Sequence, residues 1–263
     1  MNVFITGASS GIGKALAHAY AKQCSGSRMV IGLAARRIDM LQKLAKSLQE
    51  KYQIQTAIYA LDVRDKTALA NAAEDFIQRF GAPNIVNANG GVSRGTLTEF
   101  SEDTAAFQAI MDINLMGMVH TFQPFINAMK QAALQGKTAQ LVGVASVAGI
   151  RGLAGAGAYC ASKAATIAYL ESLRVEMAAY NIAVTTIAPG YVRSPMTDAN
   201  QFSMPFLMDA DVFADKFVKA VTAKRRFVVI PWQMGLVVKI MRFIPPILWD
   251  FLSKNAPHKS REN

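Results

Sequence analysis

Short strand-like runs alternate with longer helix-like runs along most of the chain, and this alternation limits the possible folds more than any other feature. The strand-like runs are rich in Val, Ile and Ala, and amphipathic stretches separate them. This is the pattern of parallel strands joined by crossover helices, which cover the sheet on both faces. The sequence therefore predicts a doubly wound α/β domain.

The predicted elements follow one another without repeats or a low-complexity linker. The predicted strands are Val3–Thr6, Met29–Ala35, Thr56–Leu61, Ile85–Asn89, Ala139–Ala145, Ile182–Ala188 and Phe227–Ile230. The predicted helices are Ile12–Gln23, Ile38–Leu48, Lys66–Phe80, Asp103–Gln135, Tyr159–Tyr180 and Asp209–Ala223. We expect residues 1–231 to form one domain with about seven strands. Residues 232–263 are expected to form an amphipathic helical tail on the same domain.

Composition bears on where such a chain works. Of its 263 residues 52% are hydrophobic and 17% charged, which argues against disorder except at the ends. Cys24 and Cys160 lie far apart, which predicts reduced thiols and no metal site. The chain begins in a strand-like run and lacks a run of about 18 apolar residues. We expect a cytoplasmic protein, either free or attached peripherally to the inner face of a membrane.

The first predicted strand runs into a glycine-rich turn and then into a helix. The expected cofactor contacts in this turn are Gly7, Ser9, Ser10, Gly11, Ile12 and Gly13. Glycines permit positive φ and close backbone approach, so the N–H groups of the helix N-terminus can bind a pyrophosphate. Packing alone is the alternative. The position in the first strand–turn–helix unit favours a dinucleotide site of Rossmann type.

The second predicted strand ends in Ala34-Ala35-Arg36-Arg37. An NAD site usually carries an acid about 20 residues beyond the glycines, which binds the ribose 2′-hydroxyl, whereas arginine suits a 2′-phosphate. The first acid here is Asp39, inside the next predicted helix. We therefore predict NADP(H), with Arg36 as the phosphate ligand and Arg37 as its helper. Two solvated arginines at the start of a helix are the alternative.

Tyr159 and Lys163 are four residues apart in a predicted helix and so share one face. An ammonium beside a phenol favours the ionised form and lowers the phenol pKa from its usual value of about 10. Such a phenol can donate or accept a proton near neutral pH. An exposed helix with a lysine reaching into solvent would show the same spacing, so the wider pattern has to decide.

The wider pattern resembles the short-chain dehydrogenase/reductase family from Val3 to about Ile230. Its marks occur in family order and are Thr6 to Gly13, Asp62-Val63, Asn114, Ser146, Tyr159 with Lys163, and Pro189-Gly190. The combination is far more specific than any one motif. The resemblance implies that residues 1–231 are an NADP-binding oxidoreductase domain.

The resemblance also implies a role for each matching residue. Tyr159 would be the general acid in carbonyl reduction and the general base in alcohol oxidation. Lys163 would lower the pKa of Tyr159 and bind the nicotinamide ribose. Ser146 would hydrogen-bond the substrate oxygen, and Asn114 would hold a water that connects Lys163 with solvent. The remaining implied cofactor contacts are Asp62 and Val63 at the adenine, and Pro189, Gly190, Val192 and Ser194 near the nicotinamide amide.

One stretch departs from the family pattern. The family usually shows Asn-Asn-Ala-Gly after the fourth strand, whereas this chain has Asn87-Ala88-Asn89-Gly90, followed by a second glycine. Asn87 and Gly90 match as cofactor-side residues, while the two central residues are exchanged. The exchange leaves open how this stretch packs and which backbone groups face the adenosine ribose.

The segment between Pro189 and Asp209 is rich in Met and Phe. In relatives this position forms a lid over the substrate, and such a lid would suit an apolar, adaptable pocket. Packing of a short helix onto the core is the alternative. The sequence of the segment does not identify the substrate.

The C-terminal tail is both basic and apolar. The net charge is +10, and residues 224–263 hold eight Lys and Arg against two acids. A helix from Trp232 should stop at Pro245-Pro246, with Lys239 and Arg242 on one narrow face. Residues 232–254 fit a membrane interface, a cover on the substrate pocket or a contact with another subunit. Because the charge accompanies aliphatic residues, we expect no nucleic-acid partner.

Three functions compete at this point. The leading one is NADPH-dependent reduction of an apolar ketone or aldehyde, with alcohol oxidation as the reverse. The second is a non-catalytic NADP-binding sensor or membrane-associated scaffold, which would not need all of Asn114, Ser146, Tyr159 and Lys163. The third is an NAD-dependent alcohol dehydrogenase, which the missing acid disfavours. Relatives commonly form homodimers or homotetramers through the helices that begin here near Asp103 and Tyr159.

Overall fold

The computed structural model describes residues 1–23, 28–200, 202–254 and 261, and it contains one sheet of seven parallel strands. The strands are β1 (Asn2–Thr6), β2 (Val30–Ala35), β3 (Gln55–Ala60), β4 (Ile85–Ala88), β5 (Gln140–Val144), β6 (Ala183–Pro189) and β7 (Phe227–Ile230). Their order in the sheet is β3-β2-β1-β4-β5-β6-β7. The predicted doubly wound fold is confirmed, and the predicted strand ends agree within one residue.

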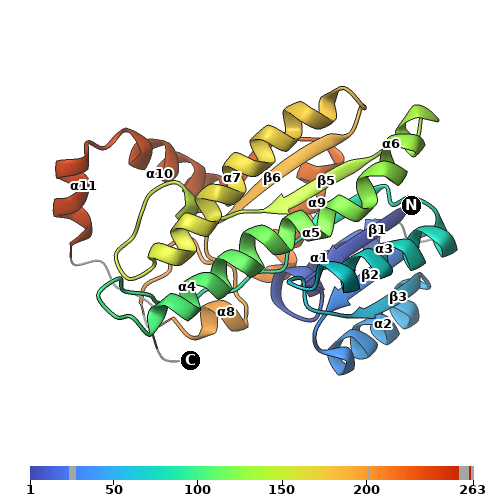
Figure 1. Cartoon of the computed structure of the whole chain (residues 1–263), viewed down its shortest axis with the longest axis horizontal. Helices are drawn as coiled ribbons and strands as arrows, with labels where there is room; N and C mark the ends of the chain where they lie inside the picture. Colours follow the sequence, from blue (N-terminus) through green and yellow to red (C-terminus); the bar gives the residue numbers. More distant parts are fainter. Residues whose placement is uncertain (24–27, 201, 255–260, 262–263) are drawn as a thin grey trace.

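Helices cover both faces of this sheet (Figure 1). The helices in chain order are α1 (Gly11–Gln23), α2 (Ile38–Tyr52), α3 (Lys66–Phe80), α4 (Asp103–Met111), α5 (Gly117–Phe122), α6 (Ile126–Leu134), α7 (Gly157–Ala178), α8 (Pro195–Asp198), α9 (Ala210–Thr222), α10 (Trp232–Phe243) and α11 (Pro246–Ser253). The last two, α10 and α11, lie at one end of the molecule.

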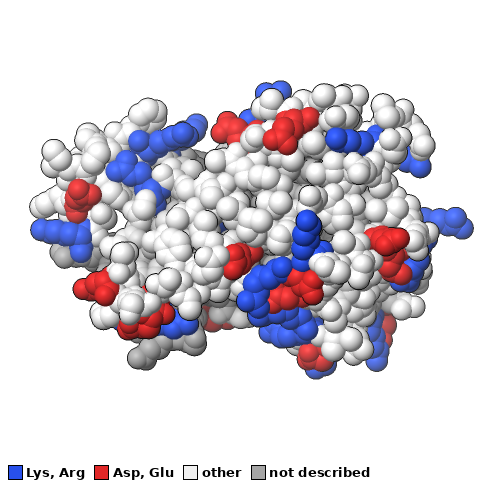
Figure 2. All heavy atoms as spheres, viewed as in Figure 1, with Lys and Arg blue, Asp and Glu red and all other residues white. Residues whose placement is uncertain are grey.

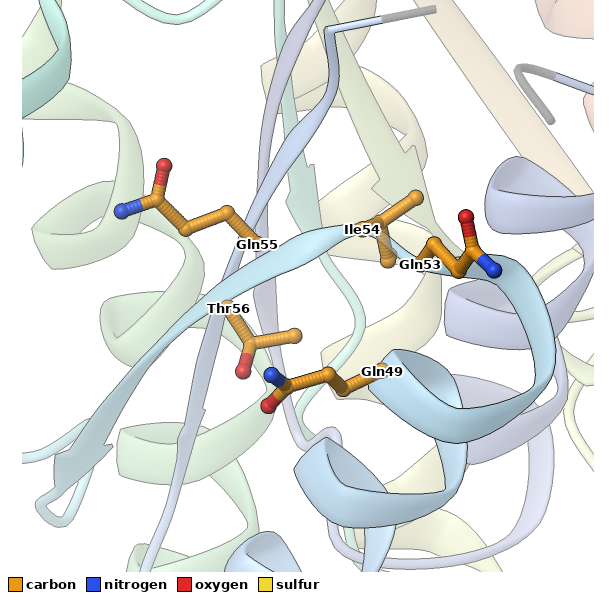
Figure 3. A pocket seen from close by; sticks show the side chains of 5 residues that line it. All are labelled: Gln49, Gln53, Ile54, Gln55 and Thr56. Atoms are coloured by element: carbon orange, nitrogen blue, oxygen red, sulfur yellow. The ribbon is translucent and has the colours of Figure 1, made fainter. Parts of the chain in front are cut away.

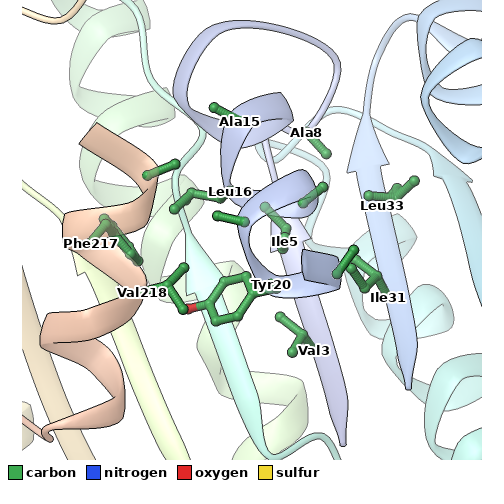
Figure 4. Packing of buried hydrophobic residues seen from close by; sticks show 14 of the residues in the cluster. Val3, Ile5, Ala8, Ala15, Leu16, Tyr20, Ile31, Leu33, Phe217 and Val218 are labelled. Carbon is green, nitrogen blue, oxygen red and sulfur yellow. The ribbon is translucent and has the colours of Figure 1, made fainter. Parts of the chain in front are cut away.

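Alternation along the strands divides the apolar core into two layers. Val3 and Ile5 of β1 pack with α1, α2 and α9, whereas Phe4 points to the other face and packs with α3 and the α5–α7 region. Figure 4 shows the first layer, with Tyr20 and Val218 between α1, α9 and the strands. Successive strand side chains point to opposite faces, so β1 anchors both layers.

The helix predicted over Asp103–Gln135 is one helical run with two irregular turns. A π-helical turn spans Asp112–Met116 and a 3₁₀ turn spans Gln123–Phe125. Pro124 accounts for the second irregularity, because proline has no N–H to donate along an α-helix. The first irregularity contains Asn114, and π turns often occur at functional positions.

Candidate active site

The carboxyl ends of β1 and β4 lie side by side at the point where the strand order reverses, since β2 and β3 follow on one side of β1 and β4 to β7 on the other. Such a switch point is where open α/β sheets bind ligands. The Thr6 hydroxyl donates to the Asn87 carbonyl oxygen at 3.4 Å and accepts from the Asn89 N–H at 3.2 Å. The Asn89 amide donates to the Thr6 carbonyl oxygen at 3.2 Å. The exchanged asparagine therefore ties the end of β4 to the glycine turn.

Asn87, inside β4, is fully buried. Its side-chain oxygen accepts from the Tyr20 hydroxyl at 3.1 Å. Asn87 thus anchors α1 to the sheet, while Asn89 faces the turn. The two asparagines of the exchanged stretch therefore pack in different places, Asn87 against α1 and Asn89 against the glycine turn.

The glycine turn is compact because two of its residues cannot carry a side chain. Gly7 has a φ of +67°, and a Cβ on it would lie 2.9 Å from the Gly90 Cα. A Cβ on Gly13 would collide with the Gly7 carbonyl oxygen. The first turn of α1, which is wholly described, contains no acidic side chain. Its N–H groups therefore offer a positive end that fits a pyrophosphate.

Two arginines follow β2 on the surface beside this turn. The Arg37 guanidinium donates to Ser9 Oγ at 3.1 Å and to Ser10 Oγ at 2.8 Å. Arg36 is exposed, and its charge contributes to lowering the pKa of Asp62. The structure thus brings Arg37, rather than Arg36, into contact with the serines of the turn.

Asp62 and Val63 follow β3 on the same edge of the sheet. Asp62 forms an ion pair with Arg64 at 2.7 Å, and hydrogen bonds from Arg64 are the main reason that its pKa is lowered. Val63 packs against Gly90 and Gly117, because Cβ atoms on those glycines would lie 3.4 Å and 2.6 Å from its methyl carbons. The pair therefore borders the glycine turn from the β3 side.

Ser146, Tyr159 and Lys163 come together beyond the end of β5. Ser146 follows that strand and caps a 3₁₀ turn by accepting from the Ala148 N–H at 3.1 Å. Its hydroxyl acts on the phenol of Tyr159 on α7, whose pKa it lowers. The Lys163 ammonium lies 5.9 Å from the Tyr159 ring centroid and donates to the Val144 carbonyl oxygen at 2.8 Å. The end of β5 and one face of α7 thus bring two hydroxyls and an ammonium into one cluster.

Asn114 joins this cluster from the π-helical turn. Its side-chain oxygen accepts from the Val92 N–H at 2.8 Å, and its amide donates to the Val92 carbonyl oxygen at 3.0 Å and to Ser162 Oγ at 2.9 Å. A Cβ on Gly91 would lie 3.3 Å from Asn114 Oδ1 and 3.6 Å from Lys163 Nζ. The two functional groups therefore flank the same small space.

The segment after β6 closes the other side of the site. The Gly190 N–H donates to the Ile230 carbonyl oxygen at 2.8 Å, and Val192 is buried. Ser194 caps α8. It also lies next to the glycine turn, because a Cβ placed on Gly11 would be 3.1 Å from the Cβ of Ser194. Of the predicted residues, Ser194 thus connects the segment after β6 directly with the start of α1.

This geometry agrees with a match to the family model for short chain dehydrogenase over residues 1–203. The chain belongs to this family. A protein of Myxococcus xanthus that is named an uncharacterized oxidoreductase is 34% identical to this chain over 246 residues, which cover 94% of this chain and 93% of the relative.

Solved structures show the same short-chain dehydrogenase fold. A 3-ketoacyl-(acyl-carrier-protein) reductase of Brucella melitensis, complexed with NADH, has a TM-score of 0.76 at 22% identity and covers 87% of this chain and 96% of its own. An L-sorbose reductase of Gluconobacter frateurii, complexed with NADPH and L-sorbose, has a TM-score of 0.75 at 24% identity and covers 87% and 94%.

The electrostatics of the cluster differ from the sequence expectation for this short-chain dehydrogenase. Burial raises the pKa of Tyr159, and the hydrogen bond with Ser146 opposes that rise. Burial also lowers the pKa of Lys163 to about 8. The Lys163 ammonium is directed at the Val144 carbonyl oxygen rather than at the phenol. Burial of Tyr159 and the direction of the Lys163 ammonium therefore both favour the proton-carrying phenol.

Sequence reasoning missed two supporting residues, Asn89 and Ser162. Ser162 accepts from Asn114 and donates to the Tyr159 carbonyl oxygen at 2.8 Å, so it links two members of the cluster. Its position between Tyr159 and Lys163 in the same helix was the available signal. The exchange in the Asn87-Ala88-Asn89-Gly90 stretch was the signal for Asn89.

The cysteines, the possible metal ligands and the surface hollow add no further group to this cluster. Cys160 is buried, which raises its thiol pKa, whereas Cys24 lies outside the described residues. Among the described residues, no group of three His, Cys, Asp or Glu could hold a metal ion. An open hollow of about 460 Å³ lies at the amino end of β3 and is lined by Gln49, Gln53, Ile54, Gln55 and Thr56 (Figure 3). It is at the opposite end of the strands from the cluster.

Proposed function

We propose that this short-chain dehydrogenase reduces an apolar ketone or aldehyde with NADPH and runs in reverse as an alcohol oxidation. The convergence of Ser146, Tyr159, Lys163 and Asn114 beside the glycine turn carries this proposal. A cofactor-binding module needs the turn, but it does not need two hydroxyls and a buried ammonium beside it. Burying an ammonium costs free energy that a hydrogen bond offsets only in part, so a module that merely bound the cofactor would gain nothing from Lys163.

The mechanism follows from what these side chains can donate. A nicotinamide, when bound, supplies the hydride. Tyr159 donates its proton to the carbonyl oxygen, and Ser146 hydrogen-bonds the same oxygen as negative charge develops on it. The resulting phenolate is stabilised by the Lys163 ammonium, since opposite charges at this separation attract. Carbonyl, hydride and proton thus yield the alcohol.

Asn114 and Lys163 are suited to return the proton. Their functional groups flank the space beside Gly91, where a water would meet Asn114 Oδ1 and Lys163 Nζ together. Asn114 is held from both ends of its amide, so its oxygen has a fixed position. We assign Asn114 a positioning role and propose the proton path from solvent through Lys163 to Tyr159.

The choice of NADPH rests on the surface beside Ser9 and Ser10. One solved structure of the same fold is complexed with NADH and another with NADPH, so the fold does not determine which of the two cofactors is bound. Arg37 contacts both serines and Arg36 precedes it in the chain, which offers two cations and two hydroxyls for a 2′-phosphate. The expected adenine contacts Asp62 and Val63 lie at the next strand end.

The apolar character of the substrate is inferred from the segment that follows Pro189. This segment leaves at Val192 and returns at Met208, where the two form a parallel bridge. The rings of Tyr191 and Phe202 contact each other edge to face at 6.3 Å. An aromatic, Met-containing cover suits an apolar ketone or aldehyde. We further propose a cytoplasmic homodimer or homotetramer, assembled through the α4–α6 run and α7.

The deciding experiment follows NADPH absorbance with ketones and aldehydes of increasing chain length. We expect turnover that rises with chain length and is lost in Tyr159→Phe. Tyr180→Phe is the matched control, because it removes a phenol just beyond the same helix. Tight NADPH binding without turnover on any member of the panel would contradict the proposal and favour a non-catalytic cofactor-binding protein.

A further inference from the structure

One face of α10 points away from the molecule and is apolar. Trp232, Leu236, Ile240 and Phe243 are exposed and follow each other at intervals of four, four and three residues, so they form one stripe. The opposite face of the helix, with Met234 and Val238, is buried. The helix is therefore apolar toward the domain and also toward solvent.

The next helix continues this surface. Ile247, Leu248, Phe251 and Leu252 of α11 are exposed, and their spacing places them on one side of the helix. Trp249 is turned to the protein, where its indole N–H donates to the Gly152 carbonyl oxygen at 3.1 Å. We call these eight exposed apolar residues of the two helices the tail face. Its most exposed members are Phe243 and Ile247, at 85% and 86%, on either side of the corner between the helices.

Contacts on the inner side hold the tail face in this orientation. A Cβ on Gly190 would lie 2.9 Å from Met234 Cγ, so α10 packs closely on the segment after β6. Arg151 donates to the Ile244 carbonyl oxygen at 3.0 Å and stacks on the Trp249 ring at 4.8 Å. Because the inner side is occupied, the tail face cannot turn inward without breaking these contacts.

The charges near the tail face are mainly positive. Lys239, Arg242 and Lys254 are exposed, whereas Asp250 is the one acid in the described part of α10 and α11. In Figure 2 the end of the molecule that carries these helices is largely white, with blue groups and a few red ones among the white surface. Two copies of this surface would repel each other, whereas an anionic surface would attract it.

We infer that the tail face docks onto an anionic lipid bilayer, with the corner between α10 and α11 inserted deepest. A helix with an apolar side and flanking cations lies in the plane of such an interface. None of the helices in the described part of the chain is long and apolar enough to cross a membrane. The tail face is therefore a peripheral contact.

This docking would bring the catalytic end of the domain to the lipid. Helix α10 follows β7 at the carboxyl ends of the strands and packs on Gly190, a residue that borders the site. An apolar carbonyl compound dissolved in the bilayer would then reach the site over a short path. This consequence rests on the proposed function, whereas the docking itself does not.

The test uses the full chain and sedimentation with vesicles of phosphatidylcholine, with and without phosphatidylglycerol. We expect binding to the anionic vesicles that 0.5 M salt weakens. Phe243→Ser with Ile247→Ser should weaken it more than about tenfold, because two large apolar side chains no longer enter the lipid. The matched control is Ile38→Ser with Val212→Ser, which changes two exposed apolar residues outside the tail and outside the helices proposed for assembly, and should leave vesicle binding unchanged.

The two tryptophans of the chain provide a second readout, since both lie in the tail. The emission of Trp232, measured in a Trp249→Phe background, should shift to the blue when anionic vesicles are added. Lys239→Glu with Arg242→Glu should abolish that shift, while Arg225→Glu with Arg226→Glu, on the turn before β7, should preserve it.

Three outcomes would overturn the inference. The first is equal recovery in the supernatant with and without anionic vesicles. The second is a loss of binding that is as large in the Ile38 and Val212 control as in the corner variant. The third is a tail face that holds two copies together, shown by monomers in the corner variant and no vesicle binding by the wild type. No measurement here uses a substrate, so failure would leave the proposed reductase untouched.

Discussion

The catalytic cluster and the tail face lie at the same end of the strands, yet they place their large side chains in opposite ways. Lys163 is 4% exposed and Asn114 is fully buried, and each is hydrogen-bonded to backbone of a strand or loop. In α10 and α11, most large apolar side chains are exposed, and few polar contacts hold the helices in place.

Buried polar groups and exposed apolar groups affect the free energy of the protein in different ways. Burying an ammonium and an amide costs free energy, which is accepted where a fixed geometry is needed for chemistry. An exposed apolar surface costs little in the isolated protein, and it gains free energy only when a partner covers it. Variants in the cluster should therefore change turnover strongly, whereas variants in the tail should change association.

The largest effect is expected for Tyr159→Phe. Removing the phenol hydroxyl takes away the proton donor, and positioned acid catalysis contributes about a hundred- to ten-thousandfold in rate. We expect kcat to fall by that factor while NADPH binding and thermal stability are retained. Stopped-flow or steady-state absorbance at the NADPH band measures it. A variant that keeps most of its turnover would show that another group protonates the substrate and that the cluster has been misread.

Lys163→Met should separate catalysis from stability. Turnover is expected to fall about a hundredfold, because the charge that stabilises the phenolate is lost. Burial lowers the Lys163 pKa to about 8, so at pH 7 the folded protein holds a buried ammonium at a cost. Replacing it with methionine should therefore raise the free energy of unfolding at pH 7.

The pH dependence checks the sign of this effect. Between about pH 8 and the usual lysine pKa of about 10.4, the unfolded chain binds more protons at this position than the folded one. The contribution of Lys163 to wild-type stability therefore rises with pH in that window, and the advantage of the methionine variant shrinks. Urea unfolding at pH 7 and pH 9.5 measures the difference. A variant that is less stable at both values would show that the hydrogen bond to Val144 outweighs the burial.

Arg37→Ala should have a smaller and more selective effect. A hydrogen bond to a charged group contributes about 1.5–3 kcal/mol, so the Kd for NADPH should rise roughly ten- to a hundredfold. The Kd for NADH should stay the same, because NADH lacks the 2′-phosphate. Arg36→Ala is the matched comparison, and its effect should be smaller since Arg37 contacts Ser9 and Ser10. Equal loss of both cofactors in Arg37→Ala would mean that the arginine supports the turn instead.

The sequence predicts features that depend on neighbouring residues better than features that depend on contacts between residues far apart in the chain. Strands, the glycine turn and the Tyr159–Lys163 helix follow from local patterns, which the neighbouring residues determine. The π-helical turn around Asn114 does not, because its geometry is coupled to hydrogen bonds with Val92, 22 residues earlier in the chain, and with Ser162 on α7.

The arginines illustrate a second limit. The sequence indicates a basic pair after β2, but adjacent residues leave an exposed strand end in different directions, and only the structure shows that Arg37 reaches the serines. The tail is a third case. Its apolar and basic residues were visible in the sequence, whereas the side of α10 that faces outward depends on Met234 packing against Gly190.

The smallest effect on stability is expected for Arg151→Ala, which cuts the connection between the two regions compared above. A partly exposed cation–π pair contributes about 0.5–1 kcal/mol, so Tm should fall by a few degrees at most. The emission of Trp249, measured in a Trp232→Phe background, should shift to the red as the ring loses the guanidinium. Turnover of a short, water-soluble ketone should be unchanged, because Arg151 lies outside the catalytic cluster. A large drop in Tm together with lost turnover would place α10 and α11 inside the cooperative unit that holds the cluster, and the two regions would then differ in exposure alone.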